Sequence, residues 1–250
     1  MTGNVRSTSV IRLVAAFFLL AASPALAGPP YVSDDAEPTD YRHFEIYAFT
    51  GGTAARAATS GSFGIDFNYG AAPDLQLTAV LPVAYEAPAG AGGALGIGNI
   101  ELAAKYRFAH QSDIGWDIAV FPRLFLPRAS AHFGDKHISV LLPLWAEKDW
   151  GDWSTFGGGG CVLSRGGGSQ DYCLAGWALT RAITPALRLG AEIVHQGAGA
   201  KGGRVSTAAG AGATYDLSET YHLLAYWGPS LENASSTGRY NWYAAVLFTF

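Results

Sequence analysis

The sequence is poor in positive charge, in cysteine and in long hydrophobic runs. Its 16 lysine and arginine residues are outnumbered by 20 acidic ones, and the formal net charge of −4 argues against a nucleic-acid-binding protein. The run from Leu13 to Ala22 is apolar but shorter than the about 20 residues that a membrane-spanning helix needs, and no other stretch qualifies. Helical periodicity is nearly absent throughout, so the sequence does not predict a protein built from helices.

The N-terminus has the pattern of a secretory signal peptide, which we place at residues 1–27. Arg6 and Arg12 flank the apolar run, and residues 25–27, Ala-Leu-Ala, supply the small-residue cleavage pattern. A membrane anchor is the alternative, but the run is too short to span a bilayer. Cleavage leaves 14 basic residues against 20 acidic ones, a net charge of −6. Residues 28–41 are acidic and too rich in proline for regular structure, so we expect them to form a leader into the fold.

Candidate sites for catalysis, metals or cofactors are few. Cys161 and Cys173 lie symmetrically about Gly167, so a hairpin with its tip there would place them on adjacent strands, where a disulfide can form. Two buried free thiols are the alternative, and no histidine beside either cysteine suggests catalysis. The six histidines lack metal-ligand spacing, and Gly96 and Gly98 lack the third glycine and the helix of a dinucleotide loop. We therefore expect no metal and no cofactor.

From residue 42 onward, the dominant pattern is alternation of apolar and polar residues in segments of roughly ten residues. The segment 99–108 shows it most clearly, because its apolar residues would share one face of a strand and its polar residues the other. The two sets are Ile100, Leu102, Ala104, Tyr106 and Phe108 against Asn99, Glu101, Ala103, Lys105 and Arg107. Segments of this kind are typical of membrane barrel strands, with apolar side chains toward lipid.

The predicted fold is all-β: an antiparallel transmembrane β-barrel of about 12 strands, an even number, over residues 42–250. Short connections alternate with longer, glycine-rich ones. The longer ones are predicted at 52–58, 86–97, 127–136, 197–203 and 229–238. Short periplasmic turns and long external loops are the asymmetry of outer-membrane proteins.

Three prolines fall inside predicted strands, at Pro82, Pro122 and Pro143. Each proline removes a backbone donor from the ladder of hydrogen bonds, and a closed barrel has no free edge on which to place it. We therefore expect a bulge or a local opening of the wall at each of them.

The polar face of the predicted barrel carries nearly balanced charges. The candidates for lining the lumen are Glu45, Asp66, Glu101, Lys105, Arg107, Asp117, Arg123, Glu147, Arg181, Arg188, Glu192 and Arg204. About twelve strands lie between the filled interior of eight and the open channel of sixteen. The lumen is therefore either a pore whose opposed charges orient a small solute or a core closed by ion pairs. Whether the leader folds into it as a plug is equally open.

The last strand, Gly238 to Phe250, has one strongly aromatic face and ends the chain on phenylalanine. It resembles the carboxy-terminal signature of bacterial outer-membrane barrels, which the barrel assembly machinery reads, so Phe248 and Phe250 are the predicted assembly signal. Further aromatic residues lie near strand ends, and we interpret them as an aromatic girdle at the lipid interface. Core packing is the alternative. These residues are Trp150, Trp153, Tyr215, Tyr221, Trp227, Tyr240 and Trp242.

Two stretches resemble the outer-membrane transporters grouped under the meta-pathway of phenol degradation. Residues 30–35, Pro-Tyr-Val-Ser-Asp-Asp, and 43–45, His-Phe-Glu, are similar to the opening of the mature chain in that family. Residues 95–108 are similar to its Gly-x-Gly-Asp-x-Glu-Leu-x-x-Lys-Tyr-x-Phe motif, with Asn99 in place of the acidic residue. The resemblance implies an outer-membrane transporter and does not imply which compound it carries.

The expected function is passive passage of small solutes, aromatic or other hydrophobic compounds among the candidates, through a transporter or narrow porin in the Gram-negative outer membrane. The expected partners are outer-membrane lipid, the assembly machinery and the solute, and no enzyme activity is predicted. One alternative is a lipid-acting outer-membrane enzyme, for which His137 and Ser139 share a strand face but lack a third, orienting residue. The other is a filled, non-conducting barrel.

Overall fold

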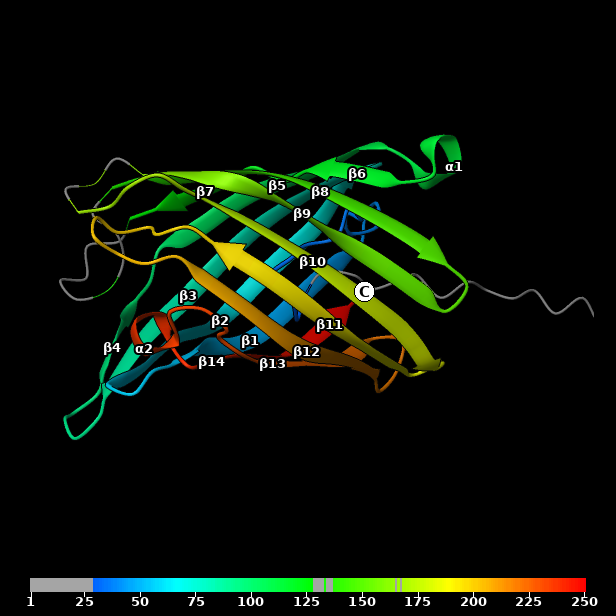
Figure 1. Cartoon of the computed structure of the whole chain (residues 1–250). Coiled ribbons are helices and arrows are strands. Elements are labelled where there is room, and N and C mark those ends of the chain that lie inside the picture. The colour runs from blue at the N-terminus through cyan, green and yellow to red at the C-terminus, as the bar shows by residue number, and fades with distance from the viewer. Residues whose placement is uncertain (1–28, 128–132, 134–136, 165, 167) are drawn as a thin grey trace, which may run out of the picture.

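The computed structural model describes residues 29–127, 133, 137–164, 166 and 168–250, and these form a closed antiparallel β-barrel (Figure 1). The predicted signal peptide, 1–27, lies outside the described residues. Within them, no helix is long and apolar enough to cross a bilayer. The elements are β1 (Phe44–Ala54), β2 (Ala58–Ala72), β3 (Leu75–Pro88), β4 (Ala94–Ile97), β5 (Ile100–Ala109), α1 (Gln111–Ile114), β6 (Asp117–Val120), β7 (Arg123–Leu126), β8 (Ser139–Trp150), β9 (Trp153–Ser164), β10 (Tyr172–Thr184), β11 (Leu187–Gln196), β12 (Ser206–Asp216), β13 (Tyr221–Pro229), α2 (Ala234–Thr237) and β14 (Tyr240–Thr249).

The barrel closes where the last strand meets the first. β14 pairs antiparallel with β1, from Thr249 opposite Glu45 to Tyr240 opposite Ala54. β4 and β5 both pair with β3, and β6 and β7 both pair with β5 and β8, so each of these two pairs forms one interrupted strand of the wall. The fourteen strands of the described residues therefore make a wall of twelve, as the sequence predicts.

The prolines lie at interruptions of the wall. Pro122 separates β6 from β7, and Pro143 of β8 faces the same gap, which a hydrogen bond from the Phe121 N–H to the Pro143 carbonyl spans at 3.3 Å. Pro82 lies where the partner of β3 changes from β5 to β4. The pairing of the strands is therefore interrupted at each of the three prolines, because proline cannot donate to the neighbouring strand.

Alternation along the strands separates an apolar outer face from a polar inner face. Leu81 and Leu142 point outward and are 57% and 53% exposed, whereas Glu147 and Glu192 point inward and are 1% and 4% exposed. This inversion of the usual arrangement suits a wall that has lipid outside. Cys161 and Cys173 lie directly opposite each other on β9 and β10 and form the predicted disulfide.

The two ends of the barrel differ, and we call them the short-turn end and the long-loop end. In Figure 1 the short-turn end, with α1, lies on the right, and the long-loop end, with α2, lies on the left. Two of the predicted long loops, 52–58 and 86–97, are wrong in length. The observed connections are only 55–57 and 89–93, because the strands continue further than expected. Gly52 and Gly61 allow this close pairing, since a Cβ on Gly52 would lie 2.4 Å from the Ser60 carbonyl oxygen. The predicted loop 127–136 lies mostly outside the described residues.

Candidate functional site

Ten of the twelve side chains predicted to line the lumen lie on the inner face of the wall. Their positions on the strands match those of buried neighbours two residues away, and five of them, Lys105, Arg107, Arg123, Glu147 and Glu192, contact the leader. The ten are Glu45, Asp66, Glu101, Lys105, Arg107, Asp117, Arg123, Glu147, Arg188 and Glu192. The lumen is therefore polar and densely charged.

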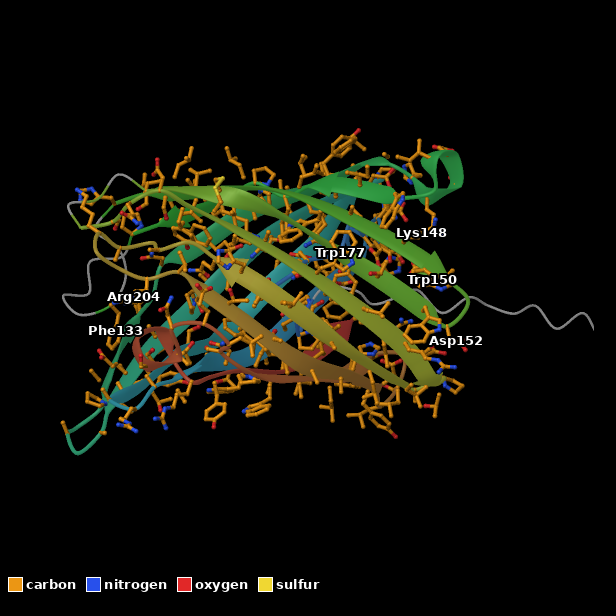
Figure 2. All side chains as sticks on the ribbon, viewed as in Figure 1. Phe133, Lys148, Trp150, Asp152, Trp177 and Arg204 are labelled. Atoms are coloured by element: carbon orange, nitrogen blue, oxygen red, sulfur yellow. A yellow bond between two sulfur atoms is a disulfide. The ribbon has the colours of Figure 1, made fainter. Side chains whose placement is uncertain are left out.

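The predictions for Arg181 and Arg204 are wrong. On β10, Ala178 and Thr180 are buried and face inward, so Arg181 points outward, where its guanidinium carbon lies 5.1 Å from the centre of the Trp153 ring. Arg204 is exposed in the loop before β12, at the long-loop end (Figure 2). Alanine and glycine dilute the alternation in this half of the chain, so the sequence pattern alone does not fix either side chain.

The acidic leader lies inside the lumen and pairs with cations of the wall. Lys105 Nζ lies 2.9 Å from Asp34 Oδ1 and 2.6 Å from Asp35 Oδ1, and it also donates to the Glu37 carbonyl. Arg123 donates to Asp34 Oδ2 at 2.5 Å. Lys105 is only 3% exposed, so the leader carboxylates supply the opposite charge that a buried ammonium requires.

Two carboxylates of the wall hold the backbone of the leader. Glu192 accepts hydrogen bonds from the N–H groups of Val32, at 3.2 Å, and Ser33, at 2.5 Å. Glu147 accepts one from the N–H of Ala36 at 3.2 Å. Hydrogen bonds to a charged acceptor are worth about 1.5–3 kcal/mol each, roughly twice those between neutral groups. These contacts fix the leader to β8 and β11.

A further contact joins the leader to a polar network on β2 and β3. Gln76 Oε1 accepts hydrogen bonds from both the N–H and the hydroxyl of Thr39, at 2.8 and 3.1 Å. Its amide nitrogen donates to Asn68 at 2.7 Å and to Thr78 at 2.9 Å. The amide of Gln76 therefore links the end of the leader to the wall.

Two inward-facing glycines make room for the ring of Tyr31. A Cβ on Gly190 would lie 2.4 Å from the Tyr31 hydroxyl, and one on Gly212 would lie 2.7 Å from the ring. The ring packs edge-on against Phe156 and Tyr226, with centroids 5.7 and 5.9 Å away. Any larger residue at either glycine would displace Tyr31, so the wall is shaped to fit the leader.

The leader carboxylates differ in their electrostatic surroundings. Burial raises the pKa of Asp34, but Lys105 and Arg123 outweigh burial and hold that pKa below its usual range. Burial outweighs Arg107 at Glu37 and raises the pKa of that carboxyl to about 7. Asp34 therefore keeps its negative charge to a lower pH than an ordinary aspartate, whereas Glu37 changes its charge near neutral pH.

The leader does not fill the lumen. A cavity of about 300 Å³ lies between the leader and the inner face of β1, β2, β3 and β5, with Glu45 and Asp66 in its lining. A second cavity of about 430 Å³ adjoins the glycine- and serine-rich ends of β1 and β2. Tyr31, Val32 and Tyr243 line both cavities, so these three residues form the boundary between them.

The residues considered for catalysis do not come together. Ser139 is 4% exposed and faces the inside of the barrel, whereas His137 is exposed just before β8, and no hydrogen bond joins them. Ser139 lines a separate cavity of about 310 Å³ at the long-loop end. Among the residues that the structure describes, no group of three or more His, Cys, Asp or Glu side chains is arranged to hold a metal ion.

Sequence reasoning left open whether the leader enters the lumen, and it named no leader residue as part of the site. The acidic pair Asp34 and Asp35 complements Lys105 and Arg123, but the residues are about 70 to 90 positions apart in the chain. A usable signal was present, since inward positions that would ordinarily hold larger side chains are glycine where Tyr31 docks. No local pattern connects those glycines to a tyrosine so far away.

A closed barrel of twelve strands with an apolar exterior and a charged lumen has the fold of outer-membrane β-barrels of the porin and transporter kind. Two solved structures share it. The COG4313 outer membrane channel from Pseudomonas putida F1 is 15% identical, with a TM-score of 0.66, covering 86% of this chain and 99% of that one. The KdgM porin is 11% identical, with a TM-score of 0.57, covering 82% of this chain and 99% of that one. No family model matches the sequence, and no curated protein matches it.

Proposed function

We propose that this chain is an outer-membrane channel through which small solutes cross passively beside its own leader. The observation that carries the proposal is the pair of cavities that meet at Tyr31, Val32 and Tyr243, because they leave free space in the lumen with the leader docked. The names of the two similar structures, a channel and a porin, agree with this function. The leader makes the channel narrower than an empty barrel of the same size.

The charges around the smaller cavity favour cations over anions. Lys105 and Arg123 border it, but their charges are matched by carboxylates of the leader. Glu45 and Asp66 also face it, and no ion pair joins either carboxylate to a basic side chain within the described residues. Rings of unpaired carboxylates are a common basis of cation selectivity in pores.

Currents through planar bilayers test this function. The purified protein in a salt gradient is expected to give small current steps and a reversal potential that favours cations. Replacing both cavity carboxylates, Glu45→Gln with Asp66→Asn, should move that potential toward anions. The matched control is Asp113→Asn with Glu219→Gln, which removes two exposed carboxylates at the short-turn end and should leave the potential unchanged.

Two outcomes would support the alternatives instead. A correctly folded protein that gives no current with any salt or solute would be a filled, non-conducting barrel. Hydrolysis of lipid by the purified protein, lost on Ser139→Ala, would make it an enzyme.

A second route, through the wall, is a candidate for aromatic or other hydrophobic solutes. Phe121 lines the smaller cavity and directly precedes Pro122, so the cavity lies next to the place where Pro122 and Pro143 interrupt the pairing of neighbouring strands. Valine at both prolines would restore two backbone donors and is expected to slow uptake of a small aromatic compound into liposomes while ion currents persist. Equal uptake by the variant would remove this route.

The remaining features of the proposal concern family and assembly. Membership in the transporter family of the phenol meta-pathway stays a prediction, as does the role of Phe248 and Phe250 as an assembly signal. Both rings lie on the outer face, where Phe248 packs 5.4 Å from Tyr221 and Phe250 packs 5.4 Å from Phe44. Deletion of Phe250 should reduce the amount of folded protein in the outer-membrane fraction, and an unchanged amount would count against the signal.

A further inference from the structure

The outer face of the strands carries two lysine or arginine side chains and no carboxylate among the residues that the structure describes. The two cations are Lys148 on β8 and Arg181 on β10, separated by one strand. Every Asp and Glu within a described strand falls on an inward position by the alternation of that strand. The lipid-facing surface therefore carries positive charge that no carboxylate of the same face balances, and an anion outside the protein can balance it.

Both cations lie over tryptophan rings near the short-turn end. Lys148 Nζ is 5.5 Å from the centre of the Trp116 ring, and Arg181 is placed similarly over Trp153. Lys148 is paired in register with Thr155 of β9, and Trp153, one outward position further along β9, is paired with Arg181. Since neighbouring strands are about 4.8 Å apart and the register offset of two residues adds about 6.6 Å along the strand, the Cα atoms of Lys148 and Arg181 are roughly 12 Å apart across β9.

An indole pair lies beside this position, with Trp116 level with Lys148 and Trp177 one outward position further from the short-turn end. Trp116 and Trp177 meet edge to face, with ring centroids 6.2 Å apart. The ring of Trp177 lies across Gly157, where a Cβ would be 2.7 Å from it. Its indole N–H donates to the Thr155 hydroxyl at 2.7 Å. The tryptophans are therefore fixed in place beside the two cations, and Figure 2 shows Lys148 nearer the short-turn end than Trp177.

Neither cation has an ion-pair partner within the described part of the chain. An unpaired cation on the lipid face of a barrel is costly at the bilayer midplane but not near the interface, where phosphate groups are within reach. Glu147 and Asp149, which flank Lys148 in the chain, lie on inward positions of β8, and Asp152, in the turn after β8, forms no ion pair with Lys148 or Arg181.

We propose that Lys148 and Arg181, with the tryptophans around them, form a binding site for the phosphate of an anionic phospholipid in the leaflet at the short-turn end. The cations take the phosphate, and the Trp116 and Trp177 rings pack against the upper part of an acyl chain. The leaflet is the periplasmic one, because short turns face the periplasm in outer-membrane barrels. The inference rests on the proposed membrane location and is independent of conductance.

Native mass spectrometry of the full mature protein in detergent, titrated with phosphatidylglycerol or phosphatidylcholine, tests the site. The wild-type protein should retain phosphatidylglycerol in preference to phosphatidylcholine. Lys148→Gln with Arg181→Gln should weaken phosphatidylglycerol binding about thirtyfold, the equivalent of about 1 kcal/mol for each cation near a membrane surface. The control, Lys201→Gln with Arg204→Gln, removes two exposed cations at the long-loop end and should leave binding unchanged.

The single variants Lys148→Gln and Arg181→Gln, each expected to weaken binding about fivefold, keep the site testable if the double variant fails to fold. Folding is followed by the heat-dependent shift in electrophoretic mobility. Equal binding of phosphatidylglycerol by the double variant and the control would overturn the site. So would equal affinity of the wild-type protein for both lipids, which would mean that the rings and cations form only a general interfacial girdle. A protein that binds phosphatidylglycerol but carries no current would retain this site and lose the proposed function.

Discussion

The two sides of the lumen carry the same kinds of side chain, but the ion pairs of the leader lie on one side only within the described residues. On β5, β7 and β11, Lys105, Arg123 and Glu192 are bound to leader atoms. On β1 and β2, Glu45 and Asp66 face a cavity and make no ion pair within the described residues. The same inward charge is therefore structural where the leader reaches it and available to a passing solute where the leader does not.

The largest effect on this division is expected from Lys105→Met. The change leaves Asp34 and Asp35 buried without the ammonium between them, and breaking a buried ion pair in this way costs about 3–5 kcal/mol. The leader should leave its site. Hydrogen exchange at the amides of Val32 and Ser33 should accelerate by about a hundredfold or more, at 1.4 kcal/mol per tenfold change, and single-channel conductance should rise.

Lys201→Met, an exposed lysine in the loop between β11 and β12, is the matched control for that variant. Its amide exchange and its currents should match those of the wild-type protein. Protected leader amides in Lys105→Met would mean that the other contacts hold the leader without the buried cation.

A smaller effect is expected from Glu192→Gln. A neutral acceptor replaces the carboxylate that binds the N–H groups of Val32 and Ser33, which should weaken the docking by about 1 kcal/mol. Exchange should accelerate at these two amides and less at Ala36, which Glu147 holds. Equal acceleration at all three positions would show that the leader binds as one unit.

The effect of pH is expected to be weaker still and to come from Glu37. Its pKa is raised to about 7 by burial, with Asp149 adding to the effect and Arg107 opposing it. Because the docked leader favours the protonated carboxyl, this stabilisation is complete below about pH 4.5 and is lost as the pH rises through 7. Leader amides, corrected for intrinsic exchange, should lose protection between pH 5 and 8.

Glu37→Gln should flatten that dependence, since an amide does not ionise in this range. If the variant and the wild-type protein lose protection in parallel as the pH rises, another group is responsible.

The smallest effect on the leader is expected from the cavity side. Glu45→Gln with Asp66→Asn alters the charge that a solute meets and touches the leader at Thr39, but it removes no contact of Val32 or Ser33, so exchange at these two amides should be unchanged. Acceleration as large as that in Glu192→Gln would contradict the division of the lumen into two sides.

Much of the wall follows from local pattern. In the first half of the chain, large apolar residues alternate with charged ones, so the inward positions of Glu101, Lys105 and Arg107 were predictable from β5 alone. The disulfide was predictable from the symmetric spacing of its cysteines about a turn. Where alanine and glycine replace large residues, the alternation carries little information, and Arg181 was assigned to the wrong face.

Other features required contacts between distant segments. The connection at 55–57 is short because glycines of β1 and β2 allow the two strands to stay paired. From the sequence alone, these glycines are equally consistent with a loop. The position of the leader depends on Lys105, Glu147 and Glu192 converging on one segment from three strands.

The sequence by itself determined which face of most strands meets lipid, because side chains of a strand alternate with a period of two whatever the strand pairs with. It also determined that a polar interior would be enclosed. Only the tertiary structure decided which inward charges bind the leader and which outward cations stand together. Closing the barrel brings residues more than a hundred positions apart into one lumen, and no local pattern records such distances.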